Sequence, residues 1–267
     1  MKIVKKIMII GTVLIIGTGV CGCGMKKNSS NESKNITLKS KPELVLNERQ
    51  KEILEEVGLP TDVEKLDSSQ QEAIIAIDEM LTAIEKKYNT SFSYAGYVAT
   101  GPLEHEHLIA YPSDGSPRRD SFEVRRTDNG YEDDYMNVAI RENFSSYLTE
   151  LARQVFKTES VKVFAEVTET TLVEVPSDEK MYNGAVGSKN YIYIDSSCIG
   201  QQEFQSYIDE LEKVFYQNEL YGISEIILLK KDEIENLDEY NYSYYDISDS
   251  YIEWKEISVQ EYKRGEK

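Results

Sequence analysis

Residues 68–88 carry the strongest helical pattern in the chain. Apolar side chains recur there at intervals of three and four residues: Ala73, Ile74, Ile77, Leu81, Ile84 and Tyr88. This spacing places them on one side of an α-helix, while charged residues occupy the other side. We expect Ser68 or Ser69 to cap the first turn. Such a helix is stable only when its apolar side packs against a second layer, so the rest of the fold must supply that layer.

Short segments of strand character follow this helix. They cover residues 92–98, 107–111, 121–127 and 131–138, and turn residues separate them. Asn129-Gly130, between the last two segments, predicts a hairpin. The expected structure is a helix on an antiparallel meander. Residues 66–138 thereby resemble the small cystatin-like helix-plus-meander modules of exported bacterial proteins of unassigned role, and this architectural resemblance implies no activity.

The same periodicities predict the remaining elements. Helices are expected at residues 48–57, 142–156 and 202–215, and strands at residues 161–167, 171–175, 190–194, 223–229 and 251–257. The order strand, helix, strand across residues 190–229 predicts a βαβ-like unit, with residues 251–257 as an edge strand. The helix over residues 142–156 is expected to bridge two halves. We therefore predict an α+β fold with two small domains, residues 43–157 and 158–267, each with a helix packed on a mostly antiparallel sheet.

The first 22 residues have the pattern of an export signal. Lys2, Lys5 and Lys6 precede an uncharged, largely apolar run from Ile7 to Gly22, which is the arrangement of a secretory signal peptide. This run of sixteen residues is shorter than the roughly 20 residues that cross a bilayer as a helix. The alternative is that the run stays as an uncleaved anchor or forms a buried helix.

The segment Val20-Cys21-Gly22-Cys23, at the end of the run, resembles the lipobox of bacterial lipoproteins. Gly22 is the small residue expected before the cysteine, and Val20 is the aliphatic residue expected three positions before it. Leu is commonest at the position of Val20, and Ala or Ser at that of Cys21. The resemblance implies cleavage before Cys23, a diacylglyceryl group on the Cys23 thiol and, often, acylation of the new N-terminus. It thus implies a protein held by covalent lipid on the extracytoplasmic face of the cell membrane.

Residues 23–42 connect the lipidated cysteine to the folded part. They are rich in Lys, Asn and Ser, so we expect a flexible, solvated tether. Without residues 1–22 the chain has 27 Lys and Arg against 48 Asp and Glu. This excess of negative charge repels nucleic acid and disfavours it as a partner. We expect a protein or another component of the cell envelope instead.

The three cysteines leave no pair for an intramolecular disulfide. If Cys21 leaves with the leader and Cys23 carries lipid, only Cys198 keeps a free thiol. Stability must then come from ordinary packing. Because Cys198 follows an apolar strand, we expect it to be a small buried residue, and a nucleophilic role is the alternative.

Four of the eight arginines lie close together in the sequence, at Arg118, Arg119, Arg125 and Arg126. Arginine binds carboxylate and phosphate groups through two parallel hydrogen bonds. This basic run in an acidic chain is therefore the best candidate for a binding surface. The alternative is that nearby acids, such as Asp120 and Glu123, neutralise it within the fold.

A second candidate surface is an acidic run rich in tyrosine. Tyr240, Tyr242 and Tyr244 alternate along it, so they would project from one side of an extended chain. Aromatic surfaces of this kind recognise proteins or sugars. The alternative is a half-buried hairpin, because tyrosine also favours strands.

Both histidines, His105 and His107, lie in one short segment. At positions i and i+2 of a strand they would share a face and offer two ligands to zinc or copper, with a third ligand from elsewhere. The sequence has no His-x-x-x-His spacing and no cysteine pair to support such a site. A polar entry to a strand is the simpler interpretation, and no metal or other cofactor is predicted.

The sequence contains no known catalytic motif. A nucleophile elbow, a phosphate-binding loop, a dinucleotide fingerprint, a zinc-protease helix and a calcium loop are all absent. Together with the lipobox resemblance, this predicts a non-catalytic lipoprotein that acts as a binding, accessory or immunity-type module. Two alternatives remain open: an exported metal-dependent hydrolase that uses His105 and His107, and a solute-binding lipoprotein that serves a transporter.

Overall fold

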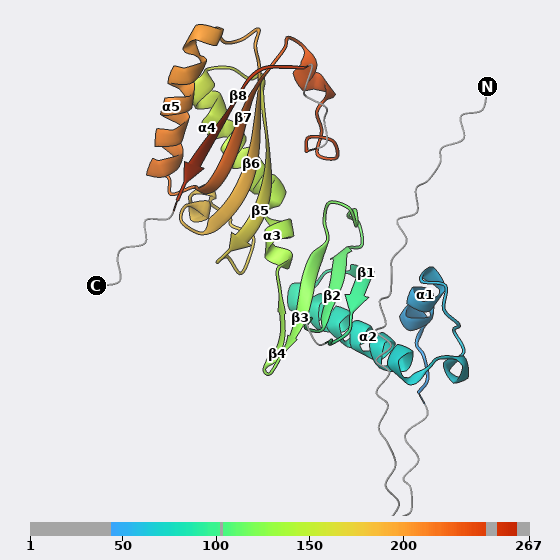
Figure 1. Ribbon diagram of the computed structural model, residues 1–267. Coiled ribbons are helices and arrows are strands. Elements are labelled where there is room, and N and C mark those ends of the chain that lie inside the picture. The colour runs from blue at the N-terminus through green and yellow to red at the C-terminus, as the bar shows by residue number, and fades with distance from the viewer. Residues whose placement is uncertain (1–43, 102–103, 244–249, 261–267) are drawn as a thin grey trace, which may run out of the picture. The chain divides into compact units, whose positions relative to one another are not determined.

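The computed structural model describes residues 44–101, 104–243 and 250–260, without the side chains of residues 201 and 202 (Figure 1). The chain divides into two compact units, Met1–Asp133 and Asp134–Lys267, which we name unit 1 and unit 2. Each combines helices with a four-stranded, mostly antiparallel sheet, so the fold is α+β, as predicted. The predicted leader, Cys23 and the predicted tether lie outside the described residues.

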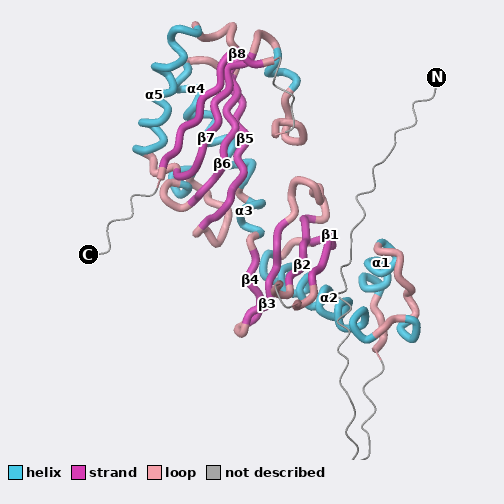
Figure 2. Tube along the Cα trace, viewed as in Figure 1, coloured by secondary structure: helices cyan, strands magenta, loops and turns pink. Residues whose placement is uncertain are grey.

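Unit 1 places a long helix against an antiparallel sheet. Its elements are α1 (Glu48–Glu56), η1 (Val63–Lys65), α2 (Ser68–Tyr88), β1 (Phe92–Val98), β2 (His107–Pro112), β3 (Phe122–Thr127) and β4 (Gly130–Asp133). The strands pair in chain order, and α2 packs against them (Figure 2). The predicted apolar side of α2 is buried, including Ile74, Ile77, Leu81 and Ile84. None of the helices in the described part of the chain combines the length and apolar character that a membrane crossing requires.

Side-chain caps define where the helices of unit 1 begin. Asn47 accepts a hydrogen bond from the Gln50 amide at 2.8 Å, and the Gln50 side chain accepts one from the Asn47 amide at 2.9 Å. α2 begins in the same way, with Asp67 and Gln70 as the reciprocal pair. The cap of α2 is thus Asp67, one residue before the predicted Ser68. Each such cap contributes about 1 kcal/mol to helix stability.

Arg49 fastens α1 to α2. Its guanidinium lies 2.6 Å from the Asp78 carboxylate and 2.7 Å from that of Glu85, and it donates to the Thr82 hydroxyl at 2.6 Å. All three partners lie on α2. Because Arg49 is partly buried, these charge-assisted bonds stabilise the helix pair more than an exposed ion pair would.

The hairpin predicted at Asn129-Gly130 is present, and it joins β3 to β4. Gly130 has a φ of 129°, which other residues rarely adopt. The strand predicted over residues 131–138 is wrong beyond Asp133, because the chain turns into a short helix there. Met136 and Ile140 are both buried four residues apart, which is a helical rather than a strand spacing.

Unit 2 is built around a mixed sheet. Its elements are α3 (Tyr135–Ala139), α4 (Arg141–Phe156), β5 (Val161–Thr170), η2 (Glu179–Tyr182), β6 (Val186–Asp195), α5 (Gln201–Gln217), β7 (Tyr221–Leu229), η3 (Glu233–Asn236) and β8 (Tyr251–Val259). The strand order is β5-β6-β7-β8, with β6 and β7 parallel and the other pairs antiparallel. The predicted βαβ unit is therefore confirmed as β6, α5 and β7, and β8 is the predicted edge strand. The strand predicted over residues 171–175 is wrong, since that segment is a loop in which Val173 is 87% exposed.

The two faces of the unit 2 sheet are covered differently. α4 and α5 lie on one face (Figure 1), where alternate strand residues such as Val163, Ile192 and Ile226 are buried. Residues 230–243 cover part of the opposite face. The apolar cluster formed there consists of Tyr193, Ile227, Leu229, Ile234 and Leu237. Ile223 and Trp254 lie beyond this cover and remain exposed.

The division between the units differs from the predicted one after residue 157. α4 does not bridge two halves but packs against β5 and α5. The Ser145 hydroxyl of α4 accepts a hydrogen bond from the Ala165 amide of β5 at 3.0 Å. α4 therefore belongs to unit 2, and the division falls after Asp133.

Candidate binding surfaces

The four arginines of the predicted basic surface do not form one patch. Arg118 and Arg119 precede β3, whereas Arg125 and Arg126 lie near its far end. Arg119 and Arg125 are six positions apart, which corresponds to up to about 20 Å in an extended chain at about 3.4 Å per residue. Since successive side chains of a strand point to opposite faces, Arg125 and Arg126 also lie on different faces of the sheet.

Carboxylates within unit 1 pair with three of these arginines. Arg119 lies 2.7 Å from Asp120, and Arg125 forms an ion pair with Glu123 in the same strand. Arg126 lies 2.7 Å from Glu106. The geometry thus favours the alternative interpretation, in which the basic run neutralises acids of its own unit.

Arg126 joins the helix of unit 1 to its sheet. Besides Glu106, it contacts Glu79 of α2 at 3.2 Å, and its guanidinium carbon lies 5.2 Å from the centre of the Tyr131 ring. Tyr97 of β1 donates its hydroxyl hydrogen to Glu106 at 2.6 Å. The hydrogen bond to Glu106 raises the pKa of Arg126, and burial together with Glu106 raises the pKa of Tyr97. Through its pairs with Glu79 and Glu106, Arg126 holds α2 to the strands.

The two histidines lie at the entry to β2. His107 begins the strand, and its Nδ1 lies 3.0 Å from the carbonyl oxygen of the exposed His105. One ring nitrogen of His107 is thus already engaged by a backbone carbonyl group. Among the described residues, no group of three or more His, Cys, Asp and Glu side chains is arranged to hold a metal ion.

The tyrosine run is a turn and not an extended row. The Asp238 carboxylate accepts hydrogen bonds from the amides of Tyr240 and Asn241, at 2.9 and 3.0 Å, and bends the chain there. Tyr240 is 55% exposed, whereas Tyr242 packs on the sheet. The prediction of one aromatic side is therefore wrong for these two residues, and Tyr244 lies outside the described residues.

Cys198 is exposed, so its predicted burial is wrong. It lies in the turn between β6 and α5. Hydrogen bonds from the hydroxyls of Thr158 and Ser160 lower the pKa of its thiol. Unit 2 contains no histidine that could act as a base for this thiol.

Sequence reasoning missed a polar seam in the core of unit 2. Ser188, Asn190 and Ser224 are all buried on the helix-covered face of the sheet. The Asn190 side-chain amide donates to the Ser224 hydroxyl at 3.1 Å. Within the described part of the chain, the Ser188 hydroxyl and the Asn190 amide oxygen have no hydrogen-bond partner. In the sequence, polar residues precede the apolar ends of β6 and β7. This was the only signal that could have indicated the seam.

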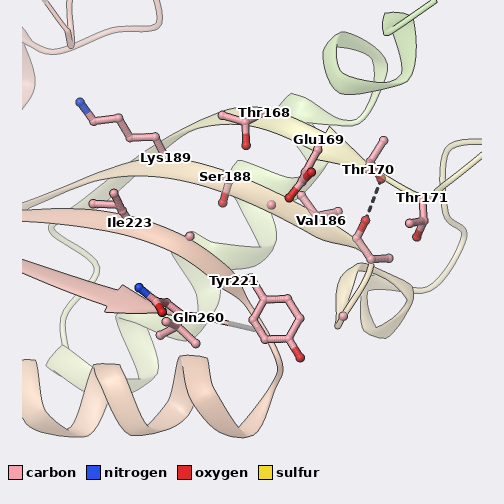
Figure 3. Close-up of a pocket in the computed structure, with 15 residues that line it drawn as sticks. Thr168, Glu169, Thr170, Thr171, Val186, Ser188, Lys189, Tyr221, Ile223 and Gln260 are labelled. Atoms are coloured by element: carbon pink, nitrogen blue, oxygen red, sulfur yellow. Dashed lines mark hydrogen bonds between the residues drawn. The ribbon is translucent and has the colours of Figure 1, made fainter. Parts of the chain in front are cut away.

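A recess of about 640 Å³ lies at the end of the unit 2 sheet where β6 and β7 begin (Figure 3). Its polar lining includes Thr168, Glu169, Thr170, Thr171, Lys189 and Gln260. Gly222 lies so close to β6 that an added Cβ would be 1.8 Å from the Ser188 carbonyl oxygen. Lys189 forms an ion pair with Glu225 at 2.9 Å, and Figure 3 shows Ser188 on the opposite side of the strand from Lys189. The recess thus offers hydroxyl and backbone groups, while its lysine is already paired.

A second hollow, of about 530 Å³, runs between α5 and the edge strand β8. It is lined by Asp209, Glu212, Lys213, Tyr216, Ser258, Val259 and Gln260. We name it the α5–β8 groove. Lys213 forms an ion pair with Glu210 at 3.5 Å, whereas Asp209 and Glu212 form none within the described residues. The groove therefore carries two carboxylates that form no ion pair among the described residues, one of which, Asp209, accepts a hydrogen bond from the Gln205 side-chain amide at 2.9 Å.

Comparison with other proteins assigns no family to the chain. No protein-family model matches it, and no curated protein sequence gives a significant match. One similar solved structure is a DUF5037 family protein from Ruminococcus gnavus ATCC 29149, with a TM-score of 0.32, 10% identity, and coverage of 60% of this chain and 78% of that chain. Another is a protein from Lactobacillus casei ATCC 334 described provisionally as a redox protein, with a TM-score of 0.22, 12% identity, and coverage of 54% and 96%.

Proposed function

We propose that this protein is a lipoprotein, anchored on the extracytoplasmic face of the cell membrane, that acts as a non-catalytic binding or accessory module. The observation that carries the proposal is the segment Val20-Cys21-Gly22-Cys23 at the end of a charged and then apolar leader. Cys23 is the residue that would carry the lipid. The described residues then form the part that the anchor presents outside the membrane.

A lipid anchor of this kind gives stable attachment without a membrane-spanning helix. One acyl chain holds a protein only marginally at a bilayer, whereas two or three chains hold it firmly. A diacylglyceryl group on Cys23 supplies two chains, and acylation of the new N-terminus supplies a third. The apolar run before Cys23 has sixteen residues, fewer than the roughly 20 of a spanning helix, and this supports cleavage over a permanent span.

The charge of the folded part limits the partners that it can bind. Residues 134–267 hold 27 Asp and Glu against 13 Lys and Arg, and residues 44–133 hold 19 against 9. Both units thus repel polyanions at neutral pH. A protein, or an envelope component with a basic surface, is the partner that this charge favours.

Metabolic labelling with radioactive palmitate tests the anchor. We expect the full chain, expressed in a bacterium, to incorporate label, and Cys23→Ser to abolish it. Cys21→Ser is the matched control, because it removes the neighbouring thiol and leaves Cys23 intact. Label that persists in Cys23→Ser, or that is lost only in Cys21→Ser, would overturn the assignment of Cys23.

A further inference from the structure

The free edge of β8 is the surface of unit 2 that is best suited to a partner chain. β8 ends the strand order of the sheet and runs for nine residues, Tyr251–Val259. Its inner edge pairs with β7, and no strand among the described residues pairs with its outer edge. The outer edge of such a strand presents a row of backbone donors and acceptors that another extended chain can satisfy.

The other edge of this sheet is not equivalent. β5 forms that edge, and the Asn137 side chain donates to the Thr168 carbonyl oxygen at 3.3 Å. α3 also packs against β5. Part of that edge is thus already covered from within unit 2, which leaves β8 as the more open of the two.

The α5–β8 groove meets β8 at Ser258 and Val259, and it sets the charge of a chain that lies along this end of the strand. The carboxylates of Asp209 and Glu212 line it and form no ion pair within the described residues. Side chains of an added strand that point toward α5 would enter this groove, because alternate residues of a strand point to the same face. Lysine or arginine at those alternate positions would neutralise the two carboxylates.

Two aromatic residues, Tyr251 and Trp254, lie on the other face of β8, and Glu256 shares that face. Tyr251 and Trp254 are 38% and 45% exposed. Trp254 pairs in register with Ile227 and so lies on the sheet face opposite the helices. Alternate residues of an added strand that point to this face would cover Tyr251 and Trp254 and remove apolar surface from water.

We infer that the outer edge of β8 binds an extended segment of a partner protein in which basic residues alternate with apolar ones. This inference rests on the binding role proposed above and names its surface and the chemistry of its partner. The basic side chains would meet Asp209 and Glu212, and the apolar ones would meet Tyr251 and Trp254. A second copy fits less well, since each copy brings the same acidic groove to the contact and like charges repel.

Trp254 gives a direct test, because it is the only tryptophan of the protein and lies on β8. The full chain, purified in non-ionic detergent, is titrated with the synthetic peptide Lys-Val-Lys-Val-Lys-Val-Lys while Trp254 emission is followed. A peptide of the same composition in blocks, four Lys followed by three Val, has the same charge but cannot alternate along a strand. We expect the alternating peptide to shift the emission and to bind at least about tenfold more tightly than the block peptide.

Two double variants distinguish the effect of the groove carboxylates on binding from the effect of the net charge of the protein. Asp209→Lys with Glu212→Lys reverses the groove, whereas Glu52→Lys with Glu55→Lys makes the same change of net charge on exposed positions of α1. We expect the first to weaken binding of the alternating peptide at least about tenfold and the second by less than about threefold. Equal binding of the two peptides, or an equal effect of the two double variants, would overturn the inference. If the groove variant fails to fold, the comparison of the two peptides still decides, and labelling at Cys23 tests the anchor separately.

Discussion

The rings of Phe164 and Tyr242 lie parallel, with centroids 4.7 Å apart and planes within 4° of each other. Phe164 belongs to β5, and Tyr242 follows η3. The Tyr242 hydroxyl donates to Glu166 at 3.0 Å, and its carbonyl oxygen accepts from the Tyr193 hydroxyl at 2.8 Å. Together with the buried Ile234 and Leu237, Tyr242 therefore holds residues 230–243 on the sheet face that the helices leave free.

Replacement of Tyr242 with alanine should destabilise unit 2 by about 2 kcal/mol. The change removes a partly buried ring, its stack on Phe164 and one hydrogen bond. Tyr242→Phe keeps the ring and should cost about 1 kcal/mol. Urea unfolding followed by Trp254 fluorescence reports on unit 2 alone. Tyr216→Ala, at an exposed position of α5, is the control and should change stability by less than about 0.5 kcal/mol; an equal loss in both alanine variants would contradict the packing role of Tyr242.

Gly222 should tolerate no side chain, whereas Gly130 should tolerate one at modest cost. Both have a φ near 130°, but a Cβ on Gly222 would lie 1.8 Å from the Ser188 carbonyl oxygen, and one on Gly130 would meet no atom within 4 Å. Gly130→Ala should lower the free energy of unfolding by about 1 kcal/mol, which is the cost of the positive φ alone. Gly222→Ala adds a collision between β7 and β6, and should lower the free energy of unfolding by more than about 3 kcal/mol. Amide hydrogen exchange, followed separately in unit 1 and unit 2, measures the two losses of stability. Similar losses of protection in the two variants would contradict this account.

Stability should fall when the pH rises above about 10. Burial raises the pKa of Tyr193, and burial with Glu166 nearby raises that of Tyr242. The folded state therefore keeps protons that the unfolded state releases near pH 10, so unfolding becomes more favourable as pH increases. The urea midpoint, measured between about pH 8 and 11, should decline only as the pH approaches and passes about 10. Tyr193→Phe should make the decline shallower, and an unchanged slope would argue against this cause.

Asp195 should make unit 2 sensitive to acid. Burial alone would raise the pKa of this carboxyl, but hydrogen bonds from the amides of Ser197 and Asp232, at 2.8 and 2.7 Å, outweigh burial and lower the pKa. The stabilisation is present above about pH 4 and is lost as the pH falls through the lowered value. Asp195→Asn should cost about 1 to 2 kcal/mol at neutral pH and flatten the acid limb of a stability curve. An acid limb that is the same in wild type and Asp195→Asn would contradict this.

Much of the fold followed from periodicity. The apolar spacing of α2, the turn at Asn129-Gly130 and the order of strand, helix and strand in unit 2 all correspond to the structure. These features are local, so the sequence carries them directly. The wrong predictions lie where contacts with other parts of the chain determine the local structure. Residues 135–139 form a helix that buries Met136, and the loop over residues 171–175 leaves Val173 in solvent.

The candidate surfaces were less predictable, because they depend on partners far away in the sequence. Arg126 looked like one of four free cations until Glu79, 47 residues earlier, came to lie beside it. Tyr242 looked like one of a row, but the Asp238 carboxylate turns the chain and Phe164 holds the ring. The α5–β8 groove joins two elements that lie more than 30 residues apart, so no local pattern could show it.

Mass spectrometry of the N-terminal peptide, from protein extracted from its native membrane, tests the central claim most directly. The account predicts a chain that begins at Cys23, with a diacylglyceryl group joined to the Cys23 sulfur by a thioether. A chain that retains residues 1–22, or a Cys23 with an unmodified thiol, would contradict it.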